Sequence, residues 1–77
     1  MAINIRLLSE NIKVERMLQG LTQQDLAKRL NINPSRLCNW EKGYRTPSIE
    51  NLLLISVALK ISIADLVRGV YEDQSGV

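Results

Sequence analysis

The 77-residue chain is long enough for one domain with a small hydrophobic core. It has no histidine and one cysteine, which excludes histidine-based catalysis, zinc sites of the Cys/His type and an internal disulfide. Residues 1–45 hold eight of the ten Lys/Arg but four of the eight Asp/Glu, so a basic half precedes an acidic half. Such a division is typical of a protein with one face that meets a polyanion.

No targeting or membrane-spanning segment is visible. Residues 1–6 lack the apolar stretch of a signal peptide, and the most apolar run, 52–61, is too short to cross a bilayer. We therefore expect a cytoplasmic protein. We also expect no cofactor, metal or small-molecule ligand, and no enzymatic activity, because no catalytic constellation or Gly-rich phosphate loop is present.

Helix start and stop signals predict five helices in one domain. The first covers about residues 8–18 and ends at Gly20. The second begins at Thr22, a good N-cap, with Asp25 at the capping-box position. It ends at Asn31, one of the few non-glycine residues that tolerate the left-handed conformation.

The third helix has the clearest boundaries. Asn33 is its predicted cap, Pro34 occupies the first helical position, and Gly43 ends it. Leu37 and Trp40 lie three residues apart and so share its inward face. Because only three residues separate the second and third helices, the two must cross steeply, which is the geometry of a helix-turn-helix.

Two further helices complete an all-α domain over residues 1–71. The fourth runs from about residues 46–48 to Lys60 and is expected to bury Ile49, Leu52, Ile55 and Leu59. The fifth is short, with Ser62 as its cap and Leu66 pointing inward. No segment alternates for long enough to predict a strand. The polar residues 72–77 are expected to form a frayed tail.

Three motifs in register resemble the Cro/C1-type (XRE) family of helix-turn-helix regulators. They are GLTQQDLAKRL at residues 20–30, LCNWEKG at residues 37–43 and TPS at residues 46–48. The resemblance covers about residues 8–67 and implies a compact five-helix lambda-repressor-like DNA-binding domain. Asn31 replaces the family's usual Gly. Pro34 stands where members often carry a base-reading Gln, which removes one hydrogen bond from the readout.

The third helix is predicted to enter the major groove of duplex DNA. With Leu37 and Trp40 inward, Ser35, Arg36 and Asn39 face outward. Arg36 can donate twice to guanine O6 and N7, and Asn39 can pair with adenine N6 and N7. The resemblance implies that these three positions read bases.

Five further residues are expected to hold the DNA backbone. Gln23 lies in the first turn of the second helix, where free N–H groups favour a phosphate. The full predicted set is Gln23, Asn33, Lys42, Tyr44 and Arg45. Arg6 and Lys13 are further candidates for contacts with the DNA backbone, but neither is expected individually to make one. By resemblance, Arg16 and Glu41 form a buried ion pair that ties the first helix to the third.

The protein is expected to be a homodimer. A fourth helix with Leu52 and Ile55 inward leaves apolar residues toward solvent, and more follow near the C-terminus. The predicted interface is Leu54, Val57, Val67, Val70 and Tyr71.

Together these features predict a DNA-binding transcriptional regulator, most simply a repressor, that binds an inverted-repeat operator. An antitoxin with the same fold, and an interaction module that has lost DNA binding, remain alternatives. The short tail after Val70 weighs against the antitoxin. The interaction module is disfavoured because the chain retains four residues expected to face DNA: Gln23, Arg36, Asn39 and Arg45. Cys38, on the third helix, is more simply a small residue beside DNA than a redox switch.

Overall fold

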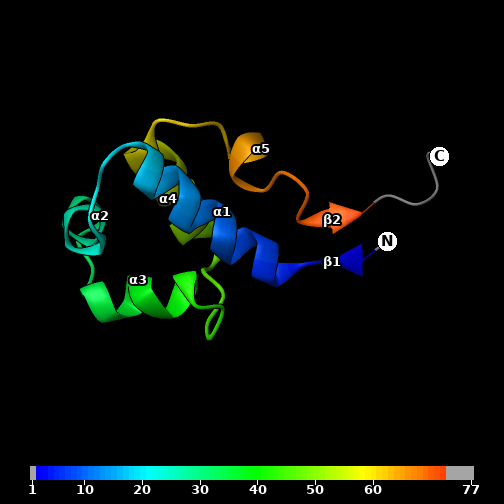
Figure 1. Ribbon diagram of the computed structural model, residues 1–77, viewed down its shortest axis with the longest axis horizontal. Helices are drawn as coiled ribbons and strands as arrows, with labels where there is room; N and C mark the ends of the chain where they lie inside the picture. Colours follow the sequence, from blue (N-terminus) through cyan, green and yellow to red (C-terminus); the bar gives the residue numbers. More distant parts are fainter. Residues whose placement is uncertain (1, 73–77) are drawn as a thin grey trace.

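The computed structural model describes residues 2–72, which form five helices and one very short antiparallel sheet (Figure 1). In chain order the elements are β1 (Ala2–Ile3), α1 (Ile5–Leu18), α2 (Gln23–Leu30), α3 (Pro34–Glu41), α4 (Ile49–Leu59), α5 (Ile63–Leu66) and β2 (Tyr71–Glu72). The five-helix fold predicted from the sequence is confirmed. No helix within residues 2–72 is long and apolar enough to cross a membrane.

A polar side chain caps the N-terminus of every helix. Each cap accepts a hydrogen bond from a backbone N–H two or three residues further on; the caps are Asn4, Thr22, Asn33, Ser48 and Ser62. The sequence did not indicate Asn4, so α1 begins three residues before its predicted start. Thr22 and Asp25 form the predicted capping box, with bonds of 3.0 and 2.9 Å.

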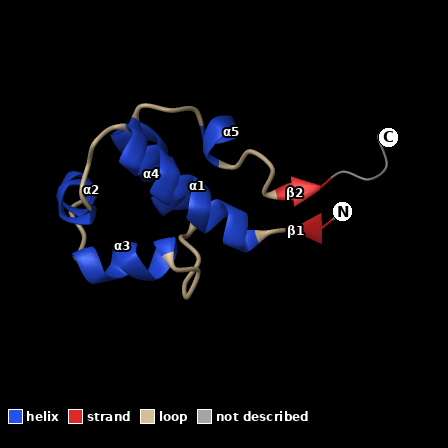
Figure 2. Cartoon of the chain, in the orientation of Figure 1, coloured by secondary structure: helices blue, strands red, loops and turns tan. Residues whose placement is uncertain are grey.

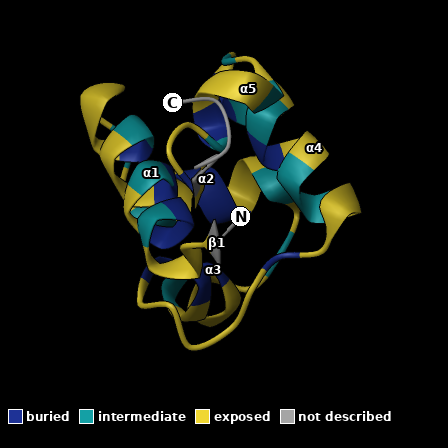
Figure 3. Cartoon of the chain, turned by 90° about the vertical axis from the view of Figure 1, so that its right-hand side faces the viewer, coloured by how far each residue is buried: buried dark blue, intermediate teal, exposed yellow. Residues whose placement is uncertain are grey.

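The core is almost entirely aliphatic and draws on all five helices. Its fully buried side chains include Ile12 of α1, Leu26 of α2, Leu37 of α3 and Ile55 of α4. Figure 3 shows these buried segments turned toward the centre of the molecule. Each such side chain contributes about 1.5–3 kcal/mol relative to an exposed one. The expectation for Ile49 is wrong: as the first residue of α4 it projects past the core and is 70% exposed.

The two strands bring the ends of the described chain side by side (Figure 2). Ala2 pairs with Glu72 and Ile3 with Tyr71, and the Asn4 N–H donates to the Val70 carbonyl over 2.5 Å. Sequence reasoning missed this pair because two residues are too few to show alternation. The expected frayed tail is therefore wrong at Glu72, which lies in β2, and residues 73–77 lie outside the described residues.

Candidate nucleic-acid interface

The turn between α2 and α3 is short because Asn31 is left-handed, with φ 57° and ψ 45°. The N–H groups of Asn31 and Ile32 donate to the carbonyls of Lys28 and Ala27, which closes the end of α2. Asn33 then caps α3 at once. Two helices of eight residues each are thus joined by three residues, as the sequence predicted.

The third helix presents the predicted reading face to solvent. Leu37 and Trp40 are 0% and 3% exposed on its inner side, whereas Ser35, Arg36 and Asn39 are exposed. These three outer residues line one shallow hollow together with Arg45 and Asn51. Asn51, in the first turn of α4, was missed because its distance along the chain gave no sign that α4 begins beside α3.

Local contacts restrict what two of these residues can do. The Asn33 carboxamide oxygen accepts both the N–H and the hydroxyl hydrogen of Ser35, at 2.9 and 2.8 Å. The Ser35 oxygen can then only accept a hydrogen bond, and an exocyclic amino group of adenine or cytosine supplies the matching donor. The Arg36 guanidinium lies 5.8 Å from the centroid of the Trp40 ring, which limits the conformations of that long side chain.

Gln23 is positioned by a carboxylate of α3. Its Nε2 donates to Glu41 Oε1 over 3.0 Å, and the residue is half-buried. One amide hydrogen is used in this contact, and the second stays available at the N-terminus of α2. The contact with Glu41 was not foreseen, because only the fold brings residues 23 and 41 together.

Arg16 and Glu41 form a buried ion pair between α1 and α3. Arg16 Nε donates to Glu41 Oε2 over 2.8 Å and Nη2 donates to Oε1 over 3.0 Å. The side chains are only 10% and 2% exposed. Arg16 Nη1 also donates to the Leu21 carbonyl over 2.6 Å. This pair therefore fixes both α3 and the segment entering α2 against α1.

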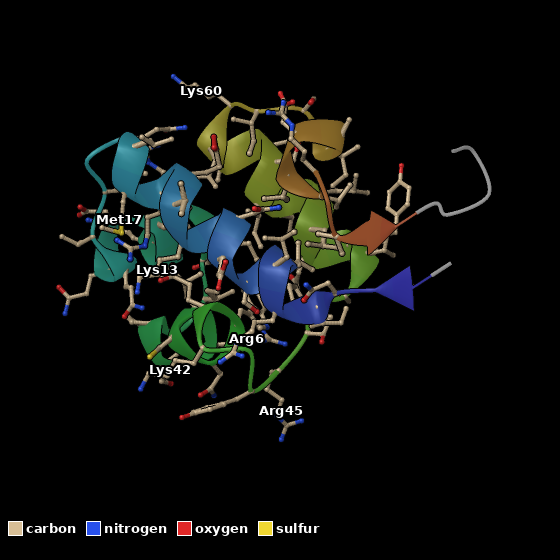
Figure 4. The ribbon with its side chains drawn as sticks, turned by 45° about the vertical axis from the view of Figure 1, so that its right-hand side comes forward. Arg6, Lys13, Met17, Lys42, Arg45 and Lys60 are labelled. Atoms are coloured by element: carbon tan, nitrogen blue, oxygen red, sulfur yellow. The ribbon has the colours of Figure 1, made fainter. Side chains whose placement is uncertain are left out.

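Three exposed residues of the predicted backbone-binding set follow α3. Lys42 Nζ lies 5.8 Å from the centroid of the Tyr44 ring, which is 72% exposed. The N–H groups of Tyr44 and Arg45 donate to the Asn39 carbonyl over 2.9 and 3.3 Å, so this turn folds back onto the end of α3. Lys42 and Arg45 lie on the same side of the molecule in Figure 4.

The residues expected at a dimer interface fall into two groups. Leu54, Val57 and Tyr71 are 48%, 75% and 54% exposed, and Val67 is half-buried against the core. The expectation that Val70 adds to the exposed surface is wrong: the residue is 7% exposed and belongs to the core, because the β1–β2 pair covers this end of the chain.

Residues 2–72 hold no group of three or more His, Cys, Asp or Glu side chains that could bind a metal ion. Cys38 is a free, half-buried thiol on α3.

Residues 12–66 match the model of the protein family described as Helix-turn-helix. The transcriptional regulator ImmR of Bacillus subtilis is 36% identical over 55 residues, which cover 71% of this chain and 43% of ImmR. The repressor protein C2 of Salmonella phage P22 is 31% identical over 67 residues, which cover 87% of this chain and 31% of C2. The chain thus spans less than half the length of these curated relatives.

Solved structures agree with the fold. The P22 c2 repressor in complex with a synthetic operator has a TM-score of 0.73 at 31% identity, and the match covers 80% of this chain and 94% of that one. The Bacillus subtilis biofilm regulator SinR in complex with DNA has the same TM-score at 30% identity, covering 78% of this chain and 97% of that one. The relatives named in these comparisons are regulators and not enzymes.

Proposed function

Because the chain belongs to the Cro/C1-type helix-turn-helix family of transcriptional regulators, we propose that it binds a specific duplex DNA sequence and represses transcription there. The observation that carries this proposal is the position of α3. Its inner side is held by Leu37 and Trp40, and its outer side presents Ser35, Arg36 and Asn39 with no covering element among the described residues. An α-helix presented in this way fits the major groove of B-DNA.

The three outer residues offer complementary hydrogen-bonding groups. Arg36 supplies donors for guanine, Asn39 pairs with adenine through one donor and one acceptor, and Ser35 accepts from an amino group. Each good bidentate contact discriminates by about 1–3 kcal/mol against the wrong base. Base preference in the proposed site thus comes mainly from Arg36 and Asn39.

The proposed contacts with the DNA backbone lie at both ends of α3. Gln23 and Asn33 lie at the N-termini of α2 and α3, where the free N–H groups and the helix dipole attract phosphate. Lys42, Tyr44 and Arg45 lie at the other end of α3, exposed and in one turn. Contacts of this kind set the register of the protein on the duplex without specifying sequence.

The proposed protein acts as a homodimer on an inverted repeat. Exposed apolar side chains at positions i, i+4, i+5 and i+8 form a stripe along α4, called here the α4 stripe: Ile49, Leu53, Leu54 and Val57. Tyr71 is exposed as well. A patch of this kind on a small domain is typical of an interface. Two-fold pairing through it would place two α3 helices about 34 Å apart, one turn of duplex.

Selection of bound sequences from random duplexes tests the proposal directly. We expect an inverted repeat, and affinity for it should fall with salt at a log–log slope of roughly −4 to −7, as about four to eight phosphate contacts require. A reporter gene driven from a promoter that contains the selected site should be repressed. If the protein binds no duplex at low salt, the alternative of an interaction module that has lost DNA binding is favoured. If it binds duplex DNA and also co-purifies with a toxin, the antitoxin is favoured.

A further inference from the structure

Helix α1 carries two cations that the proposed DNA contacts do not use. Arg6 and Lys13 are both exposed, and Ser9 lies between them along the chain, three residues after Arg6 and four before Lys13. Residues with these spacings share one face of a helix. Ser9 itself is buried, 3% exposed, so Arg6 and Lys13 flank a point where α1 is covered by another element.

The element that covers Ser9 is the turn after α3. Gly43, in this turn, faces Ser9: a Cβ atom added to Gly43 would lie 3.6 Å from Ser9 Oγ, an ordinary van der Waals distance. About two turns further along α1, the Arg16–Glu41 pair joins α1 to the last residue of α3. Two contacts therefore fix the side of α1 that bears Arg6 and Lys13 against the end of α3.

This packing gathers four cations from two segments. Figure 4 shows Arg6, Lys42 and Arg45 in the lower part of the molecule, Lys13 above them at mid-height, and Lys60 at the top. We call Arg6, Lys13, Lys42 and Arg45 the basic band. They come from α1 and from the segment just after α3, so no stretch of sequence reveals the group.

The charges of α1 are divided between its two flanks. Its carboxylates Glu10 and Glu15 line a hollow with Asp65 and Arg68 of the α5 region. The nearby Glu41 is already paired with Arg16. Among residues 2–72, the ion pairs are Arg16–Glu41 and Arg68–Asp65, and neither includes a member of the basic band. The band is thus an uncompensated positive surface.

We propose that Arg6 and Lys13 bind phosphates of the same duplex and extend the footprint of each protomer beyond the helix-turn-helix and the turn that follows it. This inference rests on the proposed function, since it needs α3 in the major groove. With α3 docked, the basic band continues from the C-terminal end of α3 to Arg6 and Lys13 on α1. A run of exposed Lys and Arg along that line fits the regular negative charge of a DNA strand.

The test compares two double variants with the same residue types and the same charge change. Arg6→Gln/Lys13→Gln removes the α1 half of the basic band, and Arg68→Gln/Lys60→Gln is the control. Operator binding is measured by fluorescence anisotropy between 50 and 200 mM salt, and hydroxyl-radical footprints are recorded for each complex. Removing two contacts per protomer from a dimer should make the log–log salt slope less steep by about 3–4.

We expect the α1 double variant to lose protection at the outer edges of the footprint, to bind operator and random duplexes more weakly by a similar factor, and to select the same bases. The control should match the wild type, and Arg6→Lys/Lys13→Arg should restore binding, which excludes a folding defect. An α1 double variant with wild-type slope and footprint would overturn the inference while leaving the proposed function intact. A wild type that binds no duplex would instead defeat the proposed function.

Discussion

Arg16 and Glu41 form a two-bond ion pair, and Gln23 donates to the same Glu41 carboxylate over 3.0 Å. One carboxylate group therefore joins α1, α2 and α3. Glu41 is the last residue of α3, and Gln23 is the first of α2. The angle between the two helices of the helix-turn-helix thus depends on a charge that is almost completely removed from water.

Breaking this pair on one side should be more harmful than removing both partners. We expect Glu41→Gln to lower the free energy of unfolding by about 3–5 kcal/mol, because Arg16 would keep a buried charge without its counter-ion. The double variant Arg16→Met/Glu41→Leu should be more stable than Glu41→Gln. Urea unfolding followed by circular dichroism measures both, and a double variant less stable than the single one would contradict this account.

Gln23 should anchor the backbone without selecting bases. Gln23→Ala is expected to weaken binding to all duplexes by a similar factor, because a phosphate contact carries no sequence information. Gln24→Ala, at the exposed neighbouring position, is the matched control and should bind as the wild type does. Affinities for the operator and for a scrambled duplex decide the matter. A loss confined to the operator would make Gln23 a base-reading residue.

Arg36 should select bases. We expect Arg36→Ala to cost about 1–3 kcal/mol on the operator and to relax the preference at one position in each half-site. Repeating the selection from random duplexes with the variant shows which position changes. Lys60→Ala, at the top of the molecule in Figure 4 and away from the basic band, is the control. If the variant selects the same motif as the wild type, Arg36 does not read a base.

Local signals in the sequence predicted much of the fold. The Thr22–Asp25 capping box, the left-handed Asn31 and the cap Ser62 each act within a few residues, so their chemistry is readable without a structure. Ile49 and Val70 were misplaced for the opposite reason. Whether a residue at the end of an element is covered depends on segments distant in sequence. Val70 is covered where β1 pairs with β2, whereas no segment within residues 2–72 covers Ile49 at the start of α4.

The same limit applies to the candidate site. Ser35, Arg36 and Asn39 share one helix, so the inward Leu37 and Trp40 were enough to predict their exposure. The Gln23–Glu41 bond, the placement of Asn51 beside α3 and the basic band all join segments that only tertiary packing brings together. Periodicity within one segment carries no information about such contacts.

The capping box at the start of α2 should make stability depend on pH. Hydrogen bonds from the backbone and side chain of Thr22 hold the pKa of the Asp25 carboxyl below its usual value. A lowered folded-state pKa stabilises the protein above the ordinary carboxyl pKa, and the contribution disappears as the pH falls through that range toward the lowered value. Asp25→Asn should therefore reduce this part of the acid dependence of urea unfolding. If the free energy of unfolding depends on pH in the same way in the variant and the wild type, the prediction is wrong.

A single polar substitution on the α4 stripe should separate the protomers. Val57 is 75% exposed, so Val57→Asp leaves the core of one protomer intact but places a charge in the proposed apolar contact. We expect this variant to be monomeric by light scattering, to keep its helical circular dichroism, and to bind the inverted repeat far more weakly than the wild type.

The matched control is Leu18→Asp, at a residue 74% exposed on α1, which adds the same charge and should remain dimeric. Val70→Asp is unsuitable as a test, because Val70 is buried and a charge there should unfold the domain. A wild type that stays monomeric at tens of micromolar and protects a single half-site would refute the dimer.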